Sequence, residues 1–321
     1  MKKRLLAVLL IVTMFGTALA LSGCGSEPAG EDEKEETGTE EETGGEEKAY
    51  TIGFSVSTLD NPFFVTMADA AKEEAAKLGI SLETLDAEDS SETQQQQIED
   101  FIMKEVDLIV INPVDSDAIG TSVIACNDAE IPVITVTRAS NDGQVVQHLD
   151  IDNYEAGMLD AQQAIKDLDG KGKIAVLEGI PGATSTNDRQ AGFEETIKKD
   201  APDMEIVTSL TANYDREEGA SVTEDILQGN PDLNAIYAHN DEMALGAVRA
   251  VASAKKLDSI KIYGIDATDD ALAAVDKGEM AATVQQQPDL QIQTALQNAV
   301  KYLNGESLEE LVNIPLKLIT K

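Results

Sequence analysis

Short strand patterns alternate with helix patterns from residue 50 to the end of the chain, and this alternation restricts the possible folds more than any other feature of the sequence. The first unit is residues 51–57, which are uncharged and rich in strand-forming residues, followed by a polar turn and a helix that begins at Pro62. Repeated strand–helix units build parallel sheets that are covered by helices. Because the ~270 residues involved exceed the usual size of one hydrophobic core, we expect an α/β fold of two doubly wound parallel-sheet lobes.

The remaining elements are expected from hydrophobic periodicity and from the Gly, Pro and Asn residues between them. Further strands are expected at 81–86, 106–111, 132–137, 144–151, 173–178, 204–211, 235–238, 260–265, 281–285 and 313–319. Further helices are expected at 94–104, at a segment ending near 129, and at 154–168, 187–199, 216–228, 242–254, 271–277 and 288–304.

The first 24 residues have the pattern of an export signal and are excluded from the fold. Residues 2–4 are basic, residues 5–21 are apolar, and a Leu-Ser-Gly-Cys sequence ends at Cys24. This resembles a bacterial lipoprotein signal, in which Cys24 would be the lipidated first residue of the mature chain. A plain transmembrane anchor is the alternative, but ~17 apolar residues lie at the bottom of the spanning range. We therefore expect an exported, extracytoplasmic protein that is lipid-anchored to the cell membrane.

Residues 25–48 have the composition of a disordered acidic linker. They contain eleven Asp and Glu, two Lys and no large apolar residue, so they cannot bury a core. The whole chain has a formal net charge of −36. Such an acidic protein is not expected to bind nucleic acid.

Motifs for catalysis, cofactors or metals are not found in the sequence. The Gly-containing turn at residues 179–184 lacks the Lys and the spacing of a phosphate-binding loop. His148 and His239 are the only histidines and are far apart, which makes a zinc site improbable. Cys126 is the only cysteine after Cys24, and it is expected to be a buried small hydrophobic residue. We therefore expect no enzyme activity, no cofactor and no metal.

Polar and aromatic residues follow the expected strand ends in both halves of the chain. Parallel sheets bind ligands at the carboxyl ends of their strands, and planar rings with Arg, Asn, Asp and Gln suit a cluster of sugar hydroxyls. The adjacent rings of Phe63 and Phe64 could be a stacking platform for a small flat ligand or could be core residues. The polar candidates are Asn61, Arg138, Arg189, Asn240, Asp266 and Gln286.

Four segments resemble the ribose-binding proteins of bacterial ABC importers. They are residues 57–64 (STLDNPFF), 111–118 (INPVDSDA), 132–135 (PVIT) and 240–247 (NDEMALGA), in the same order as in that family. The resemblance implies a periplasmic binding protein fold of type I, with two lobes joined by three crossover strands. It implies an N-terminal lobe of 49–151 plus 287–313 and a C-terminal lobe of 152–286 plus 314–321.

The resemblance also implies a set of ligand-binding residues. They are Asn61, Phe63, Phe64, Thr137, Arg138, Arg189, Tyr214, Asn240, Asp266 and Gln286. Two of these depart from the family pattern: Thr137 replaces an Asp, and Tyr214 replaces a Phe. The loss of a carboxylate at Thr137 leaves a pentose, a hexose or a related furanose as the expected ligand rather than ribose itself.

Three functions remain open at this point. The chain could be a receptor that delivers a monosaccharide to the permease of an ABC importer, or one that presents its sugar to a sensor kinase or chemoreceptor. The third possibility is the effector domain of a sugar-responsive repressor. It is disfavoured because a signal and an acidic tether stand where a basic DNA-binding domain would be needed. The protein is expected to be a monomer.

Replacing the proposed lipidation residue tests the interpretation of the N-terminus. Cys24→Ala should abolish incorporation of radiolabelled palmitate into the expressed protein, because position 24 would have no thiol to carry the acyl chain. Equal labelling of the variant and the parent would show that residues 1–24 are not a lipoprotein signal.

Overall fold

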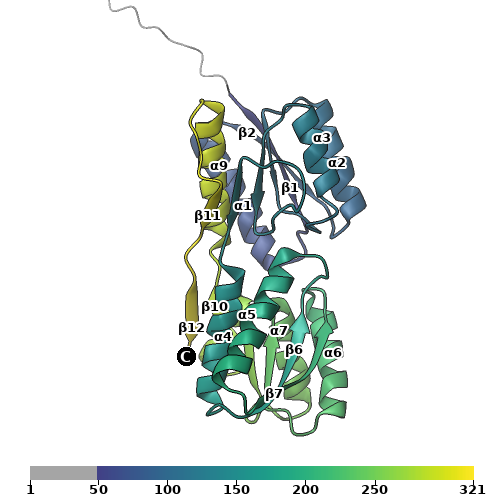
Figure 1. The fold of residues 1–321 in the computed structure, drawn as a ribbon, viewed down its shortest axis with the longest axis vertical. Coiled ribbons are helices and arrows are strands. Elements are labelled where there is room, and N and C mark those ends of the chain that lie inside the picture. Colours follow the sequence, from purple (N-terminus) through teal and green to yellow (C-terminus); the bar gives the residue numbers. More distant parts are fainter. Residues whose placement is uncertain (1–48) are drawn as a thin grey trace, which may run out of the picture. The chain divides into compact units, whose positions relative to one another are not determined.

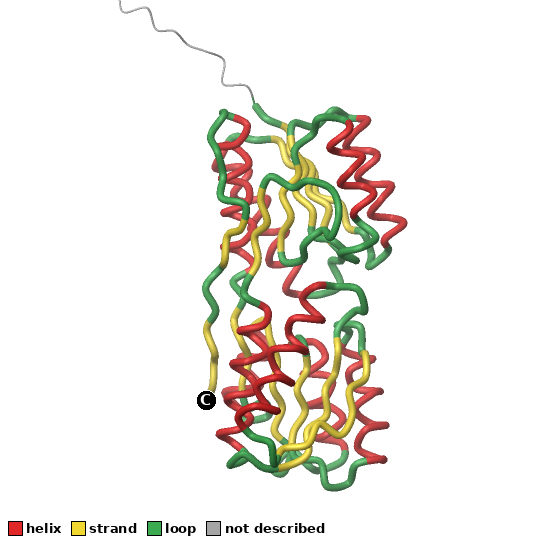
Figure 2. Tube along the Cα trace, in the orientation of Figure 1, coloured by secondary structure: helices red, strands yellow, loops and turns green. Residues whose placement is uncertain are grey.

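Strands and helices alternate along most of residues 49–321, the part of the chain that this computed structural model describes (Figures 1 and 2). The expected signal, Cys24 and the acidic linker at 25–48 lie outside the described residues. The strands form two six-stranded sheets, each with its own helices. The expected fold class of two doubly wound α/β lobes is confirmed.

The first sheet has the strand order β11-β5-β4-β3-β1-β2 and is parallel throughout. Its strands are β1 (Thr51–Val56), β2 (Ser81–Asp86), β3 (Leu108–Ile111), β4 (Val133–Val136), β5 (Gln147–Asp150) and β11 (Leu311–Asn313). Its helices are α1 (Pro62–Leu78), α2 (Ser91–Met103), α3 (Gly120–Asp128) and α9 (Pro288–Leu303).

Both faces of the first sheet are buried, which explains why its strands are apolar without alternation. In β3, Leu108 and Val110 belong to the core under α1 and α9, while Ile109 and Ile111 belong to the core under α2 and α3. Successive side chains of a strand point to opposite faces, so one short strand supplies both cores.

The beginning and the end of the described chain meet in this lobe. Helix α9 contributes Ile292 and Leu296 to the same core as Met67 of α1. Gln297 Nε2 also donates a hydrogen bond to Glu74 Oε1 at 2.7 Å. The first sheet is therefore covered on one face by helices that are more than 200 residues apart in sequence.

The second sheet has the strand order β12-β10-β9-β8-β6-β7. Its strands are β6 (Gly172–Glu178), β7 (Met204–Thr211), β8 (Ala235–Ala238), β9 (Lys261–Asp266), β10 (Ala282–Gln285) and β12 (Lys317–Thr320). Its helices are α4 (Asn153–Asp167), α5 (Thr184–Asp200), α6 (Arg216–Gly229), α7 (Asp241–Ser253) and α8 (Asp269–Lys277).

The chain passes between the two sheets three times, after β5, after β10 and after β11 (Figure 1). The expectation of one strand at 313–319 is wrong, because β11 ends at Asn313 in the first sheet and β12 begins at Lys317 in the second. Pro315 lies between them and has no N–H to donate to a sheet ladder. Strand β12 is also antiparallel to β10, so the second sheet is parallel except at this edge.

A carboxyl group is buried without a hydrogen-bonding partner in the second lobe. Asp160 on α4 is 0 % exposed, and neither of its side-chain oxygens has a partner among the described residues. Burial, together with the charge of Asp241, raises the pKa of Asp160 well above its ordinary value. The folded protein therefore favours the protonated, neutral form of this side chain.

Asp160 should make the protein less stable as the pH rises. The carboxyl group of an unfolded Asp ionises near pH 3.9, whereas the folded protein favours the neutral form of Asp160. Above about pH 3.9, folding must therefore be accompanied by protonation of Asp160, and the free energy of unfolding falls as the pH rises. The Asp160→Asn variant should melt at the same temperature as the parent near pH 4 and a few degrees higher at pH 8. Thermal unfolding measured from pH 4 to pH 8 checks this.

The exposed Asp225 on α6 provides a matched control. Asp225→Asn makes the same chemical change on the surface and should leave the pH dependence of the parent intact. If Asp160→Asn followed the parent curve at every pH, the buried carboxyl would not be neutral in the folded state.

Candidate ligand-binding site

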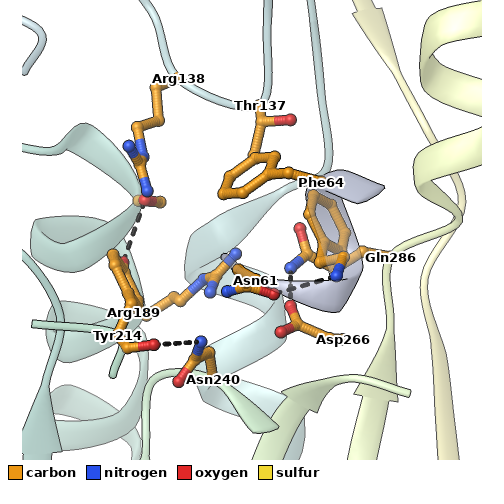
Figure 3. A pocket seen from close by; sticks show the side chains of 11 residues that line it. Asn61, Phe64, Thr137, Arg138, Arg189, Tyr214, Asn240, Asp266 and Gln286 are labelled. Carbon is orange, nitrogen blue, oxygen red and sulfur yellow. Dashed lines mark hydrogen bonds between the residues drawn. The ribbon is translucent and has the colours of Figure 1, made fainter. Parts of the chain in front are cut away.

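The carboxyl ends of strands from both sheets surround one small pocket of about 270 Å³ (Figure 3). A space of this size suits a ligand of one ring rather than an oligosaccharide. The structure brings together all ten residues that the sequence predicts for the site, and Ser185 in addition. The lining residues are Asn61, Phe63, Phe64, Thr137, Arg138, Ser185, Arg189, Tyr214, Asn240, Asp266 and Gln286.

The first helix places two aromatic rings at the pocket. Asn61 caps α1 by accepting a hydrogen bond from the backbone N–H of Phe63 at 2.9 Å, and Pro62 occupies the first helical position. The rings of Phe63 and Phe64 pack edge to face, with centroids 5.1 Å apart. Both rings are nearly fully buried and belong to the core under α1 and α9, yet both line the pocket. The two interpretations of this pair are therefore compatible.

Thr137 and Arg138 enter the pocket from a sharp turn at the end of β4. Thr137 has a φ of 67°, and the N–H of Arg138 donates to the carbonyl oxygen of Val136 at 2.7 Å, which makes a γ-turn. A β-branched residue is strained in this conformation. The hydroxyl of Thr137 donates to Gln291 Oε1 at 3.0 Å, so it can offer only its lone pairs and its methyl group to a ligand.

The guanidinium of Arg138 is held by backbone carbonyl groups. Its Nη1 donates to the carbonyl oxygens of Pro113 at 2.9 Å and Val114 at 3.3 Å. Its Nε is buried and has no partner among the described residues. Burial lowers the pKa of Arg138, and the charge of Arg189 lowers it further. Arg138 therefore contributes a desolvated positive charge with an unused donor.

Arg189 extends from α5 and is fixed in a similar way. Its Nε donates to Asn153 Oδ1 at 2.8 Å and its Nη1 donates to the carbonyl oxygen of His239 at 2.6 Å. Helix α4 can approach the backbone of α5 closely at Arg189 because Gly157 has no Cβ, which would lie 2.2 Å from the carbonyl oxygen of Arg189. Like Arg138, Arg189 is only 3 % exposed.

Tyr214 lies close to both guanidinium groups. The guanidinium carbon is 5.4 Å from the ring centroid for Arg138 and 5.9 Å for Arg189, within cation–π range. The phenol oxygen is hydrogen-bonded to Ser185 Oγ at 3.1 Å and Thr186 Oγ1 at 2.9 Å. The ring lies directly on the backbone of Gly179, where a Cβ would be 2.0 Å from it. The extra hydroxyl of Tyr214 is thus satisfied within the protein.

The remaining polar groups come from the second lobe. Asn240 caps α7 by accepting from the N–H of Met243 at 3.0 Å, and its side-chain amide donates to the carbonyl oxygen of Tyr214 at 3.2 Å. Gln286 Nε2 donates to Asp266 Oδ1 at 2.5 Å, while Gln286 Oε1 is buried without a partner among the described residues. Burial, and next the charge of Asp241, raises the pKa of Asp266 well above its ordinary value. This carboxyl group therefore favours its neutral form.

Some residues that shape the site are not predicted by the sequence analysis. Ser185 lines the pocket as the second residue of α5, and Asn153, outside the lining, supports Arg189 from the first residue of α4. Each follows a turn at the beginning of a helix, a position that also suits an ordinary helix cap. Their sequence signal is therefore weak.

The two histidines and Cys126 are structural. Burial lowers the pKa of His148 to about 4 and that of His239 to about 3, so both rings are neutral at pH 7. Cys126 is fully buried, and burial raises the pKa of its thiol to about 12. Residues 49–321 contain no group of three or more His, Cys, Asp or Glu side chains that could hold a metal ion. Within the same residues, every helix is too short or too polar to cross a bilayer.

Comparisons with known proteins agree with this fold and site. Residues 52–307 match the family described as a periplasmic binding protein domain. The ribose import binding protein of Bacillus subtilis (strain 168) is 38 % identical over 320 residues, which cover 99 % of each chain.

Two similar solved structures are solute-binding proteins of ABC transporters. One, from Bacillus halodurans C-125 with bound myo-inositol, has a TM-score of 0.80 and 36 % identity over 84 % of this chain and 94 % of the other. The other, from Actinobacillus succinogenes 130z with bound D-allose, has a TM-score of 0.80 and 31 % identity over 84 % of this chain and 97 % of the other.

These relatives are named as binding proteins and not as enzymes, in agreement with the sequence analysis. The resemblance found in the four sequence segments is confirmed as well. The chain belongs to the periplasmic binding protein family and has its two-lobed type I fold.

Proposed function

We propose that this protein is an extracytoplasmic, lipid-anchored receptor that binds a monosaccharide between its two lobes and delivers it to the permease of an ABC importer. The observation that carries this proposal is the composition of the pocket, in which rings and hydrogen-bonding side chains from both sheets surround a space of about 270 Å³. Sugars require both kinds of group, since they present apolar C–H faces to rings and many hydroxyls to polar side chains.

Each of the ten predicted residues would contact the part of the sugar that suits its side chain. The rings of Phe63 and Phe64 would enclose the sugar, and Asn61 and Asn240 are positioned by their helix caps to meet its hydroxyls. Gln286 has a buried acceptor that a sugar hydroxyl would satisfy. Thr137, Arg138, Arg189, Tyr214 and Asp266 complete the lining.

The ligands in the names of the relatives support a single-ring polyol. The Bacillus subtilis relative is named for ribose, and the two solved structures hold myo-inositol and D-allose. These ligands share a compact ring with several hydroxyls and differ in ring size and substituents. Since Thr137 gives the pocket a hydroxyl and a methyl group in place of a carboxylate, we do not assign ribose as the ligand.

Direct contacts across the pocket support a mechanism in which the lobes close on the ligand. Ala183, the residue before α5, makes no side-chain cap for this helix. Instead Ser116, from the loop after β3, accepts a hydrogen bond from the backbone N–H of Thr184 at 3.4 Å. A residue of the first lobe thus takes the position of a helix cap in the second, and this contact would form only when the lobes are closed.

The two arginines should dominate the affinity for the ligand. A thermal-shift screen of aldoses, ketoses and inositols would identify a ligand, and isothermal titration would then compare Arg138→Ala and Arg189→Ala with the parent. Each variant should bind ~10- to 100-fold more weakly, because charge-assisted hydrogen bonds contribute about 1.5–3 kcal/mol each. The exposed Arg249→Ala is the matched control and should bind like the parent. Parent-like affinity in both pocket variants would place the ligand elsewhere.

A buried chain of hydrogen bonds connects Arg189 to the crossing segments. Asn153 accepts from Arg189 and its amide donates to Asp150 Oδ2 at 2.6 Å. Asp150 ends β5, the strand before the first crossing, and its carbonyl oxygen accepts from the N–H of Ile314 in the third crossing at 2.8 Å. We infer that Asn153 positions Arg189 and couples it to the segments that must bend when the lobes close.

Asn153→Ala should weaken ligand binding about tenfold, equal to ~1.4 kcal/mol, because Arg189 loses the acceptor that orients its guanidinium. If Asn153 acts through Arg189, the same substitution in an Arg189→Ala background should have little further effect. Isothermal titration of the parent, both single variants and the double variant measures this coupling. Additive losses of affinity would mean that Asn153 stabilises the lobe without positioning Arg189.

A further inference from the structure

The arginines of the pocket differ from the other arginines in the described chain in having no carboxylate partner. Arg216 forms ion pairs with Glu242 at 2.6 Å and Asp270 at 3.1 Å, and Arg249 pairs with Glu217 at 2.6 Å. Among residues 49–321, by contrast, no Asp or Glu oxygen lies within 4.0 Å of a guanidinium nitrogen of Arg138 or Arg189.

Among the arginines that the structure describes, only the two buried ones of the pocket lack a carboxylate partner. The chain has 60 Asp and Glu against 24 Lys and Arg, so carboxylates are abundant. The more exposed Arg216 and Arg249 form ion pairs with carboxylates. Arg138 and Arg189 are each only 3 % exposed and form no such ion pair with any described residue. A buried charge without a partner is costly, whereas exposed pairs contribute little. The pocket is therefore built to receive negative charge from outside the protein.

The nearby acidic groups do not supply that charge within the pocket. Asp266 is the only carboxyl group in the lining, and burial favours its neutral form. Asp89 and Asp150 act on Arg138 electrostatically but do not line the pocket, and burial raises the pKa of Asp89 and raises that of Asp150 to about 8. Asp160 and Asp188 act on Arg189, and burial raises the pKa of both.

The hydrogen-bonding groups lead to the same conclusion. Arg138 Nε is a buried donor with no partner among the described residues, and the hydroxyl of Thr137 donates to Gln291 rather than to the pocket. Among the residues that line the pocket, Gln286 Oε1 is the only buried acceptor without a hydrogen-bonding partner in the described part of the chain. A ligand with one strong acceptor group beside Arg138 and hydroxyl donors elsewhere would satisfy both.

We propose that the ligand is an acidic monosaccharide with a sugar ring, a hexuronate, whose carboxylate lies between Arg138 and Arg189. A carboxylate matches the planar guanidinium fork, and its charge would relieve the repulsion between the two arginines. This inference rests on the proposed function, because it names the class of sugar that the same pocket binds.

Matched pairs of ligands test the charge directly. The full chain is titrated calorimetrically at pH 7.5 with D-galacturonate and D-galactose, and with D-glucuronate and D-glucose. At least one acid should bind ~10-fold or more tightly than its neutral parent sugar, and high salt should reduce this preference only slightly because both arginines are nearly fully buried.

Substitutions at Thr137 then locate the charge effect. Thr137→Asp places a carboxylate next to Arg138, and it should lower the affinity for the acid at least ~10-fold while sparing or improving binding of the neutral sugar. Thr137→Asn has the same shape without the charge and tolerates the positive φ at this position, so it should retain the preference for the acid. Asn can still donate to Gln291 Oε1 through its amide, whereas Asp cannot, so the charge effect is measured as the change in the ratio of acid to neutral-sugar affinity in each variant.

The outcomes separate this inference from the function on which it rests. Tighter binding of the neutral sugar in every pair, or binding of a neutral sugar alone in a wider screen, overturns the inference and leaves a sugar receptor in place. Equal loss of the acid in Thr137→Asp and Thr137→Asn also overturns it. If neither acids nor neutral sugars bind, the proposed function itself is wrong.

Discussion

Two like charges held within cation–π distance of one aromatic ring are the constraint on which the pocket depends. Arg138 comes from the first lobe and Arg189 from the second, and the ring of Tyr214 lies within cation–π distance of both. Backbone carbonyl groups hold the two guanidinium groups in place. Because carbonyls orient a guanidinium without neutralising it, the charge remains available to a ligand.

Several residues at the pocket have backbone conformations with a positive φ. Positive φ values occur at Thr137 (67°), Tyr214 (62°), Asp266 (138°) and Gln287 (56°), three of which line the pocket and the fourth of which follows Gln286. Such conformations cost about 1–3 kcal/mol each and persist only when the surrounding structure determines them. These four residues lie at or just after strand ends next to the pocket. The regular parts of the strands lie in the apolar cores, which stabilise the sheets.

The sequence predicts the fold and the location of the site because both are encoded locally. Alternating strand and helix patterns define the two sheets, and the carboxyl ends of parallel strands place Arg138 at the pocket end of the first sheet and Asp266 at the pocket end of the second. The role of each lining residue in ligand binding remains a prediction. The error at 313–319 arose because apolar residues on both sides of Pro315 read as one strand, although they pair with different sheets. Asn153 and the neutral state of Asp266 depend on contacts and burial between distant segments, which no local pattern records.

The packing of α9 against α1 has a consequence for the order of folding. Residues 153–285 build almost the whole second sheet and its helices from one continuous segment, and only its edge strand β12 comes later. The first lobe, in contrast, lacks one wall of its core until Ile292 and Leu296 are available. Its closing contacts join segments more than 200 residues apart, and contacts of such long range form slowly. The part of the protein that is made first is therefore completed last, because its core is closed only after α9 has been synthesised.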